Sequence, residues 1–212
     1  MLSASQSTLS WPLGHDPSEE PSASLGTRLL TSEDIPGLCA RDIDGTKISF
    51  GNHSVGPDET HMAILPTADI IGWQHDRAGF IGLKARGKAP QSLGSICESV
   101  DTWIYWYHDF RARELMIQRA RIPADHTQIH EEALASLLLD ALKEARKWDL
   151  PRVVLWDPNS FLLRAMELLS GKFGVDVKIE ERIGRNNPSV RWRGSDETKK
   201  ITAPMNEFYA WS

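Results

Sequence analysis

The sequence predicts an α+β fold, in which a mixed and mainly antiparallel sheet is flanked by helices. Three strand patterns follow one another closely between residues 93 and 122, and such short spacing favours an antiparallel meander. Farther along the chain, two helical patterns alternate with strand patterns, so we expect helices to lie against the faces of the sheet.

The start of the chain has the composition of a poorly ordered segment. Residues 1–25 are rich in serine, proline and glutamate, and such a segment buries too little apolar surface to offset the entropy lost on ordering. We expect residues 1–25 to form a loosely ordered arm and residues 26–212 to form a single domain. Residues 26–60 stay rich in turn formers, and Thr31–Asp34 is the capping signal of a short helix.

The next part of the chain predicts one helix among several strands. A strand over His61–Leu65 ends at Pro66, and a helix begins at Asp69 and breaks between Gly87 and Pro90. The three strands of the meander are predicted over Leu93–Glu98, Thr102–Phe110 and Glu114–Ile122.

The clearest element is a helix over Ile129–Trp148, where apolar residues recur with the helical period. Acidic residues fall in its first turn and basic residues in its last turn, and both placements suit the helix dipole. After it, the patterns predict a buried strand over Arg152–Trp156, a helix over Phe161–Leu169, a half-buried strand over Val175–Glu180, and short strands over Ser189–Arg193 and Glu207–Trp211.

Composition excludes several classes of protein. The net charge of −5 lacks the basic excess of a dedicated nucleic-acid binder. No apolar run approaches the roughly 18 residues that a membrane span needs, and the N-terminus has no secretory signal. Cys39 and Cys97 are too few for a disulfide framework. We therefore expect a cytoplasmic protein with reduced thiols and no nucleic-acid or membrane partner.

The second strand of the meander carries aromatic residues on both of its faces. Because successive side chains point to opposite faces, Trp103, Tyr105 and Tyr107 share one face, and Trp106 and His108 share the other. One face is expected to pack on a helix. The other is expected to line a cleft or a partner surface, since an aromatic face seldom stays open to water.

Titratable groups are expected at the rim of this cleft. The acid–base candidates are His75 and Asp76 on the preceding helix, with His108 and Glu114 at the strand ends. The substrate-binding candidates are the aromatic residues Trp73, Trp103, Tyr105, Trp106 and Tyr107.

Motifs for other chemistries are missing. His126 and His130 have the i, i+4 spacing of two zinc ligands, but Thr127 stands where the zincin helix requires glutamate, and we expect no metal. The sequence has no nucleophile elbow, no P-loop and no dinucleotide-binding glycine fingerprint.

Several motifs spread over residues 60–212 occur in an order shared with one family. The long helix ends in Ala145–Leu150 and is followed by Val153–Asn159 and a short helix. Other matching segments are Ile70–Arg77 with Phe80, Trp103–Trp106, Leu155–Pro158, Pro188–Trp192 and Asn206–Trp211. In this order the chain resembles the GNAT fold of N-acetyltransferases, and more narrowly the C-terminal domain of the fungal lysine acetyltransferases.

This resemblance implies a GNAT-like sheet but not ordinary use of acetyl-CoA. Working acetyltransferases hold the pyrophosphate on backbone N–H groups of a Q/R-x-x-G-x-G/A turn after the fourth strand. The corresponding segment here, Ile122–Glu132, has no glycine and carries three acidic residues. In the relatives an N-terminal domain carries the acetyl-CoA motif, and we expect this chain to stand alone without it. The expectation is no cofactor, with acetyl-CoA disfavoured.

Three functions stay open. The first is a small-molecule metabolic enzyme that uses cofactor-free acid–base chemistry, such as cyclisation, isomerisation or hydrolysis. The second is an N-acetyltransferase acting on a lysine-like amine. The third is a non-catalytic, degenerate GNAT domain that binds a ligand or pairs with a partner chain or a second copy through an aromatic face.

Overall fold

The computed structural model describes residues 5–12, 25–52, 56, 58–123, 125–181, 200–202 and 207–211. A seven-stranded sheet has the order β2-β4-β5-β6-β7-β1-β8. Every neighbouring pair in it is antiparallel except β6 and β7, which are parallel. The strands are β1 (Ser5–Ser10), β2 (Arg28–Leu30), β4 (Gly94–Cys97), β5 (Thr102–Asp109), β6 (Glu114–Arg121), β7 (Val153–Trp156) and β8 (Asp176–Glu181). This mixed, mainly antiparallel sheet confirms the predicted α+β class.

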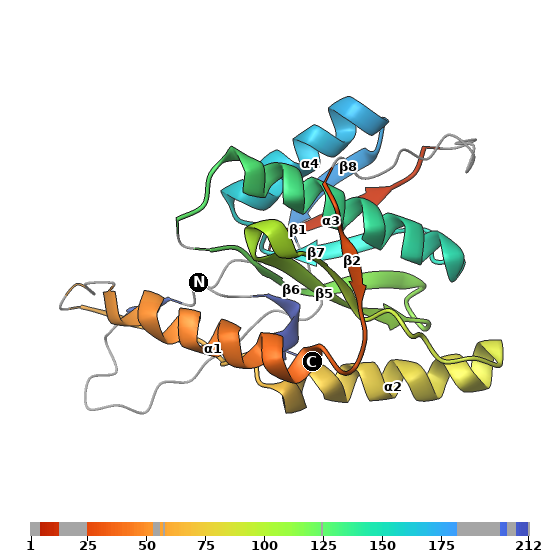
Figure 1. Ribbon diagram of the computed structural model, residues 1–212, viewed down its shortest axis with the longest axis horizontal. Coiled ribbons are helices and arrows are strands. Elements are labelled where there is room, and N and C mark those ends of the chain that lie inside the picture. Colours follow the sequence, from red (N-terminus) through yellow and green to blue (C-terminus); the bar gives the residue numbers. More distant parts are fainter. Residues whose placement is uncertain are drawn as a thin grey trace.

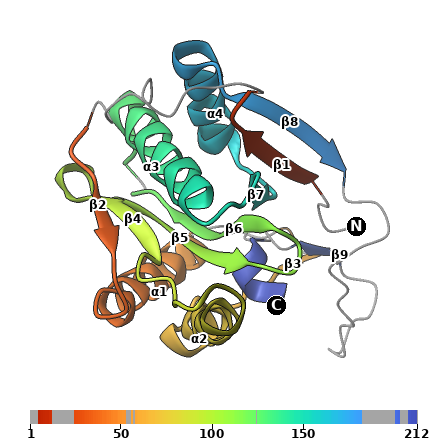
Figure 2. The ribbon, with the colours of Figure 1, turned by 90° about the vertical axis from the view of Figure 1, so that its right-hand side faces the viewer.

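Helices cover both faces of the sheet (Figures 1 and 2). One face carries α3 (Gln128–Lys147) and α4 (Ser160–Phe173), and the other carries α1 (Ile35–Asn52) and α2 (Ala68–Arg86). The remaining elements are a parallel pair, β3 (Glu59–His61) with β9 (Lys200–Thr202), and two short 3-10 helices, η2 (Glu98–Val100) and η3 (Phe208–Trp211). Among the described helices, none is long and apolar enough to cross a bilayer.

The main core lies between the sheet and α3. Apolar residues of α3 recur every three or four positions, and Leu134, Leu137 and Leu138 are fully buried. They pack in one cluster with Ile104 and Trp106 of β5. Each buried leucine of this kind stabilises the fold by roughly 1.5–3 kcal/mol. The predicted amphipathic helix is therefore confirmed in place and in orientation.

Both faces of β5 are buried, which corrects the expectation that one of them lines a cleft. Ile104 and Trp106 belong to the core under α3, while Trp103 and Tyr105 pack in a second cluster with residues of α1 and α2. Helix α1, of which the sequence indicated only a short start, supplies the cover on that second face.

Strand β1 corrects the expectation of a loose arm for Ser5–Ser10, while residues 13–24 of that predicted arm lie outside the described residues. It lies inside the sheet and pairs with β7 on one side and β8 on the other. Its alternate residues Ser7 and Leu9 are fully buried, so one leucine with small neighbours suffices for an inner strand. The composition of residues 1–25 concealed this short pattern.

Other differences concern the ends of elements. The segment predicted as a strand over Glu207–Trp211 is the 3-10 helix η3, because the consecutive side chains of Phe208 and Tyr209 both point inward, which a strand does not allow. Helix α4 continues past Gly171 and ends at Gly174, whose φ of 64° is left-handed. Strand β3 ends at His61, where the predicted strand began. The predicted strand over Ser189–Arg193 lies outside the described residues.

Candidate functional site

The candidate site lies where the two parallel strands part. Strands β6 and β7 pair only from Leu115 with Val153 to Ile117 with Leu155. Beyond this point β7 ends at Trp156, whereas β6 continues to Arg121 with only β5 as its partner. The edge of β6 that faces away from β5 is therefore open to other groups over its last residues.

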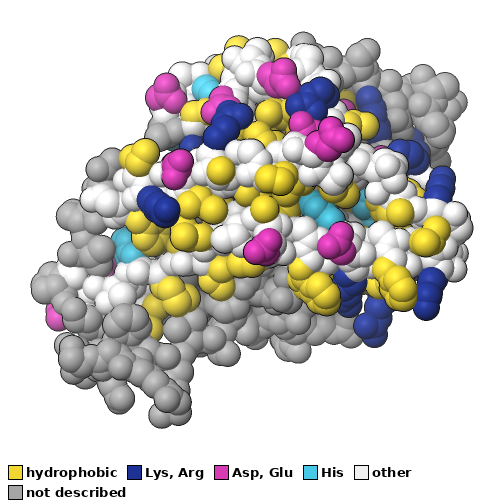
Figure 3. All heavy atoms as spheres, turned by 60° about the horizontal axis from the view of Figure 1, so that its bottom comes forward, with side chains coloured by type: hydrophobic (Ala, Val, Ile, Leu, Met, Phe, Trp, Pro, Cys, Tyr) yellow, Lys and Arg dark blue, Asp and Glu magenta, His cyan; other side chains and the backbone are white. Residues whose placement is uncertain are grey.

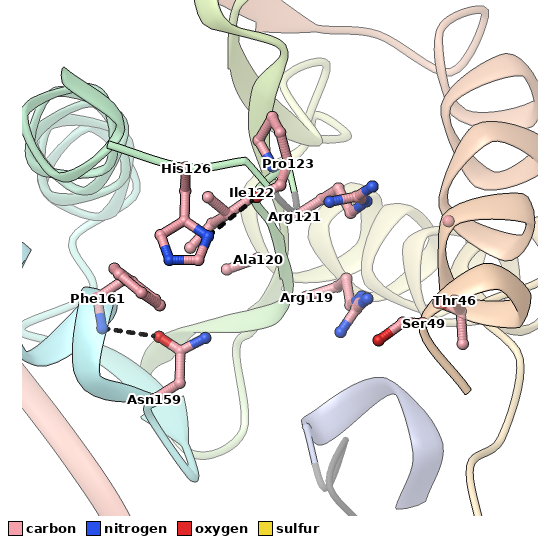
Figure 4. Close-up of a pocket in the computed structure, with 11 residues that line it drawn as sticks. Thr46, Ser49, Arg119, Ala120, Arg121, Ile122, Pro123, His126, Asn159 and Phe161 are labelled. Atoms are coloured by element: carbon pink, nitrogen blue, oxygen red, sulfur yellow. Dashed lines mark hydrogen bonds between the residues drawn. The ribbon is translucent and has the colours of Figure 1, made fainter. Parts of the chain in front are cut away.

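A pocket of about 250 Å³ fills this opening (Figure 4). The end of β6 forms its floor, α1 forms one wall, and the start of α4 with the segment after β6 forms the other. The lining residues are Gly45, Thr46, Ser49, Arg119, Ala120, Arg121, Ile122, Pro123, His126, Asn159 and Phe161.

A buried ion network supports the floor. The Arg119 guanidinium donates from Nε and Nη2 to the two carboxylate oxygens of Asp42 on α1, at 2.8 and 2.9 Å. It also pairs with Glu207, whose other oxygen accepts the backbone N–H of Ala120 at 3.1 Å. Burial opposes the charge on Arg119, but the two carboxylates outweigh it and raise its pKa. Glu207 thus fixes the C-terminal η3 on the open edge of β6.

Arg121 is the cation of the site that has few partners. Within the described part of the chain, its one ion pair is a 3.4 Å contact between Nε and Asp42, a carboxylate already held twice by Arg119. The guanidinium carbon also lies 5.9 Å from the centroid of the Trp103 ring. Burial, together with the nearby cations Arg119 and Arg41, lowers the pKa of Arg121. The guanidinium lies against α1 at Gly45, where an added Cβ would come within 2.5 Å of Nη2. An anion beside Arg121 would relieve this crowding of positive charge.

The opposite wall presents an aromatic ring and an amide. Asn159 caps α4, and its Oδ1 accepts from the backbone N–H groups of Phe161 and Leu162 at 3.1 and 3.0 Å. This leaves the side-chain NH₂ of Asn159 directed toward the cavity (Figure 4). The His126 ring lies edge-on to Phe161, with centroids 3.9 Å apart. The site therefore offers two kinds of donor, a guanidinium and an amide, across a small hollow.

The start of α3 borders the same pocket, and two of its backbone donors, the N–H groups of Thr127 and His130, are engaged by the chain itself. Thr127 N–H donates to His130 Nδ1 at 2.9 Å, and Pro123 has no N–H to offer. Glu131 in the first turn forms an ion pair with Arg164 of α4. His130 thus acts as part of a helix cap, and among the described residues no cluster of three or more His, Cys, Asp or Glu side chains could hold a metal ion.

The structure does not bring the four acid–base candidates together. His75 Nε2 lies 3.0 Å from the Trp106 carbonyl, and burial lowers the pKa of His75 to about 4. Asp76 is exposed beside it, and both residues line a groove along α2. His108 is enclosed on the other face of the sheet, with Nε2 3.2 Å from Glu144, and burial lowers its pKa. Glu114 pairs with Arg152 at the far end of β6.

The aromatic candidates also lie apart from the pocket. Trp103, Tyr105, Trp106 and Tyr107 are 5% exposed or less, because helices cover both faces of β5. Trp73 is 57% exposed on the outer surface of α2. Among the described residues, none of these five lines the pocket at the end of β6, and their substrate-binding role stays a prediction.

Sequence reasoning missed Asp42, Arg119, Arg121 and Asn159. A signal was present: Arg119 and Arg121 alternate at the carboxyl end of the strand, directly before the Ile-Pro that follows it. Side chains two apart on a strand share a face, so this pattern places two cations at one edge of the sheet. Asp42 gave no such signal, because residues 26–60, which contain it, are rich in turn-forming residues.

Comparison with known proteins now assigns the fold. Residues 10–212 match the family model described as the LYC1 GNAT-like C-terminal domain. The chain is 30% identical over 139 residues to an uncharacterized protein of Saccharomyces cerevisiae, which is 65% of this chain and 34% of that protein. It is 27% identical over 122 residues to a lysine acetyltransferase of Yarrowia lipolytica, which is 58% of this chain and 30% of that protein.

The matched part thus spans about a third of the length of these curated relatives. The family model, in contrast, covers this chain nearly from end to end. The parting of β6 and β7, with α3 between them in sequence, agrees with the GNAT-like fold that the motif order implied. The chain belongs to the family of LYC1 GNAT-like C-terminal domains.

Proposed function

We propose that this domain binds a small metabolite with a carboxylate group, of the amino-acid class that includes lysine, in the pocket between β6 and β7. The observation that carries the proposal is Arg121, a partly buried guanidinium whose one ion pair is long and shared. A guanidinium recognises a carboxylate through two parallel hydrogen bonds, and few other side chains do so.

The rest of the pocket suits such a ligand. Its volume of about 250 Å³ lies just below the range of drug-sized ligand sites, roughly 300–1,000 Å³, and matches a small metabolite. The Asn159 amide adds a neutral donor opposite Arg121, and Phe161 adds an apolar surface for an aliphatic chain. The name of the Yarrowia lipolytica relative, a lysine acetyltransferase, supports lysine as the first ligand to test.

Three features of the start of α3 disfavour binding of the pyrophosphate of acetyl-CoA there. A cradle for it needs free backbone N–H groups and room for the phosphates. Here Pro123 lacks the N–H, His130 takes the N–H of Thr127, and Glu131 adds negative charge to the first turn. These contacts support a substrate-binding role for the domain over acetyl transfer on this turn.

The cofactor-free enzyme gains no support from the geometry. Its four acid–base candidates lie on different faces of the sheet or at different ends of β6. Binding is therefore the function that we place first, and the acetyltransferase alternative second, because the name of one relative favours it.

Titration calorimetry tests the proposal with a panel of ligands. We expect binding of L-lysine or another amino acid, no binding of butylamine, which lacks the carboxylate, and no binding of acetyl-CoA. Arg121→Gln should weaken carboxylate binding roughly tenfold to a hundredfold, because it removes a charge-assisted pair.

Arg164→Gln is the matched control, since Arg164 is an exposed arginine of α4 outside the pocket lining. It should bind as tightly as the unaltered chain. Equal binding by Arg121→Gln, or no carboxylate bound at millimolar concentration, would contradict the proposal. Tight binding of acetyl-CoA would instead favour the acetyltransferase alternative.

A further inference from the structure

Helix α2 presents large apolar side chains on its outer surface. Trp73, Phe80 and Leu83 are 57%, 60% and 59% exposed. Beside them runs a groove of about 480 Å³, lined mainly by apolar and small residues of α2 and by residues of the start of α1 and of the segment before β4. Figure 3 views the molecule from this side and shows hydrophobic side chains gathered on it, with acidic ones between them and basic ones toward one end.

Two glycines in this helix have no explanation within the chain. Gly82 is required, because an added Cβ would come within 3.0–3.1 Å of Lys88, Phe110 and Pro90. At Gly72 an added Cβ would meet nothing within 4 Å, and at Gly79 only Ala89, at 3.9 Å. Each glycine destabilises a helix interior by roughly 0.5–1 kcal/mol relative to alanine. Their positions favour a neighbour that packs against α2 from outside.

The outer surface of α2 is organised in two rows with a spacing of seven residues. Asp69, Asp76 and Leu83 form one row, and Gly72, Gly79 and Arg86 form the adjacent one. Seven residues make about two helical turns, so the members of each row lie on one side of the helix. The acidic residues of these rows lie toward the N-terminal end, and the basic residue lies at the C-terminal end.

This pattern is complementary to itself when two helices run antiparallel. We propose that the face of α2 formed by Trp73, Phe80, Leu83, Gly72 and Gly79 binds the same face of a second copy of this chain. Around a two-fold axis that passes between Arg77 and Ala78, Leu83 of one copy lies opposite Gly72 of the other. The same axis places Arg86 of one copy opposite Asp69 of the other.

This one register therefore brings Leu83 onto Gly72 and Arg86 to Asp69 at the same time. The leucine fills the space that the missing Cβ leaves, which allows the two helices to approach closely. The ion pairs occur twice, as an isologous interface requires. Arg86 is available for this contact, since its ion pair with Asp149 is long at 3.6 Å and more than a third of its side chain is exposed.

Charge reversal tests this arrangement in a way that a folding defect cannot imitate. Sedimentation equilibrium of the unaltered chain should show a concentration-dependent shift from 23.8 kDa toward twice that mass. Asp69→Arg and Arg86→Asp should each place like charges opposite each other twice, and each should raise the dimer dissociation constant roughly tenfold to a hundredfold.

Mixing the two variants in equal amounts should restore the dimer, because each ion pair is then rebuilt with reversed polarity. Glu167→Arg on α4, far from this face, is the matched control and should dimerise like the unaltered chain. A monomer at all concentrations would overturn the proposal. A dimer that ignores both charge reversals, or a mixture that stays monomeric while each variant retains its helical circular dichroism, would overturn it as well.

Discussion

The two faces of the sheet are built from different chemistry. Under α3 the core is almost entirely apolar, and the buried contact between His108 and Glu144 lies at the edge of that core. Under α1 and α2 the buried groups include Asp42, Arg119 and His75. The apolar face supplies most of the stability and, through Asn159 and Phe161 at the start of α4, one wall of the pocket. The charged face supplies the α1 wall, and its carboxylates fix Arg119 in the floor of the pocket and leave Arg121 with one long ion pair.

The largest expected effect is the loss of folding stability when the buried ion network of the charged face is broken. Arg119→Met should destabilise the protein by about 3–5 kcal/mol, because Asp42 and Glu207 would be left buried without the partner they share. Guanidinium unfolding followed by circular dichroism measures the loss. Replacing Arg119, Asp42 and Glu207 together by apolar residues should recover most of it. A loss below 1 kcal/mol for Arg119→Met would show that the network does not support the floor.

The next effect concerns the protonation of His75, a buried residue of the charged face. Burial lowers the pKa of His75 to about 4 from an ordinary value near 6.5, so the unfolded chain binds this proton more readily than the folded one. Stability from this group is present above pH 6.5 and is lost as the pH falls toward 4, by roughly 3 kcal/mol in all.

His75→Gln keeps an amide donor for the Trp106 carbonyl and removes the proton. Unfolding free energies measured between pH 7 and pH 4 should therefore fall less steeply in this variant than in the unaltered chain. Carboxylates that titrate in the same range are common to both proteins and cancel in the difference. Parallel curves would contradict the account of His75 as a buried neutral imidazole.

The smallest effect concerns Asn159, which caps α4 and also offers its amide to the pocket, and two variants separate these two roles. Asn159→Ala removes the cap of α4 and should cost about 1 kcal/mol, a fall in Tm of a few degrees. Asn159→Asp keeps a capping oxygen, so its Tm should stay close to that of the unaltered chain. It should nevertheless lose carboxylate binding, since a negative charge would replace the amide. Equal carboxylate affinity in Asn159→Asp would remove Asn159 from the site.

The apolar face and helix α2 were predictable from the sequence, and α1 with the buried charges beneath it was not. The helical period and the placement of charges predicted a helix over Ile129–Trp148, and α3 spans nearly the same range. Strands β4, β5 and β6 were predicted within a residue or two for the same reason. Periodic burial leaves a local pattern, and local patterns can be read from one sequence.

The site depends on contacts between distant parts of the chain. Arg119 is 77 residues from Asp42 and 88 residues from Glu207, and no local pattern links them. Helix α1 contains three glycines that lower its helical signal, and one of them, Gly45, is small because the Arg121 guanidinium lies against it. The aromatic composition of β5 predicted a cleft or a partner surface on one of its faces, yet its residues pack in the two cores.

The central claim is that Arg121 and Asn159 bind a carboxylate where β6 and β7 part. Two-dimensional ¹⁵N NMR of the arginine Nε–H and asparagine side-chain signals tests it most directly, with L-lysine as the first ligand and butylamine as its control. The account predicts that lysine shifts the signals of Arg121 and Asn159 in a saturable way, while that of Arg164 stays in place. Shifts confined to the start of α3, or the same shifts with butylamine, would contradict it.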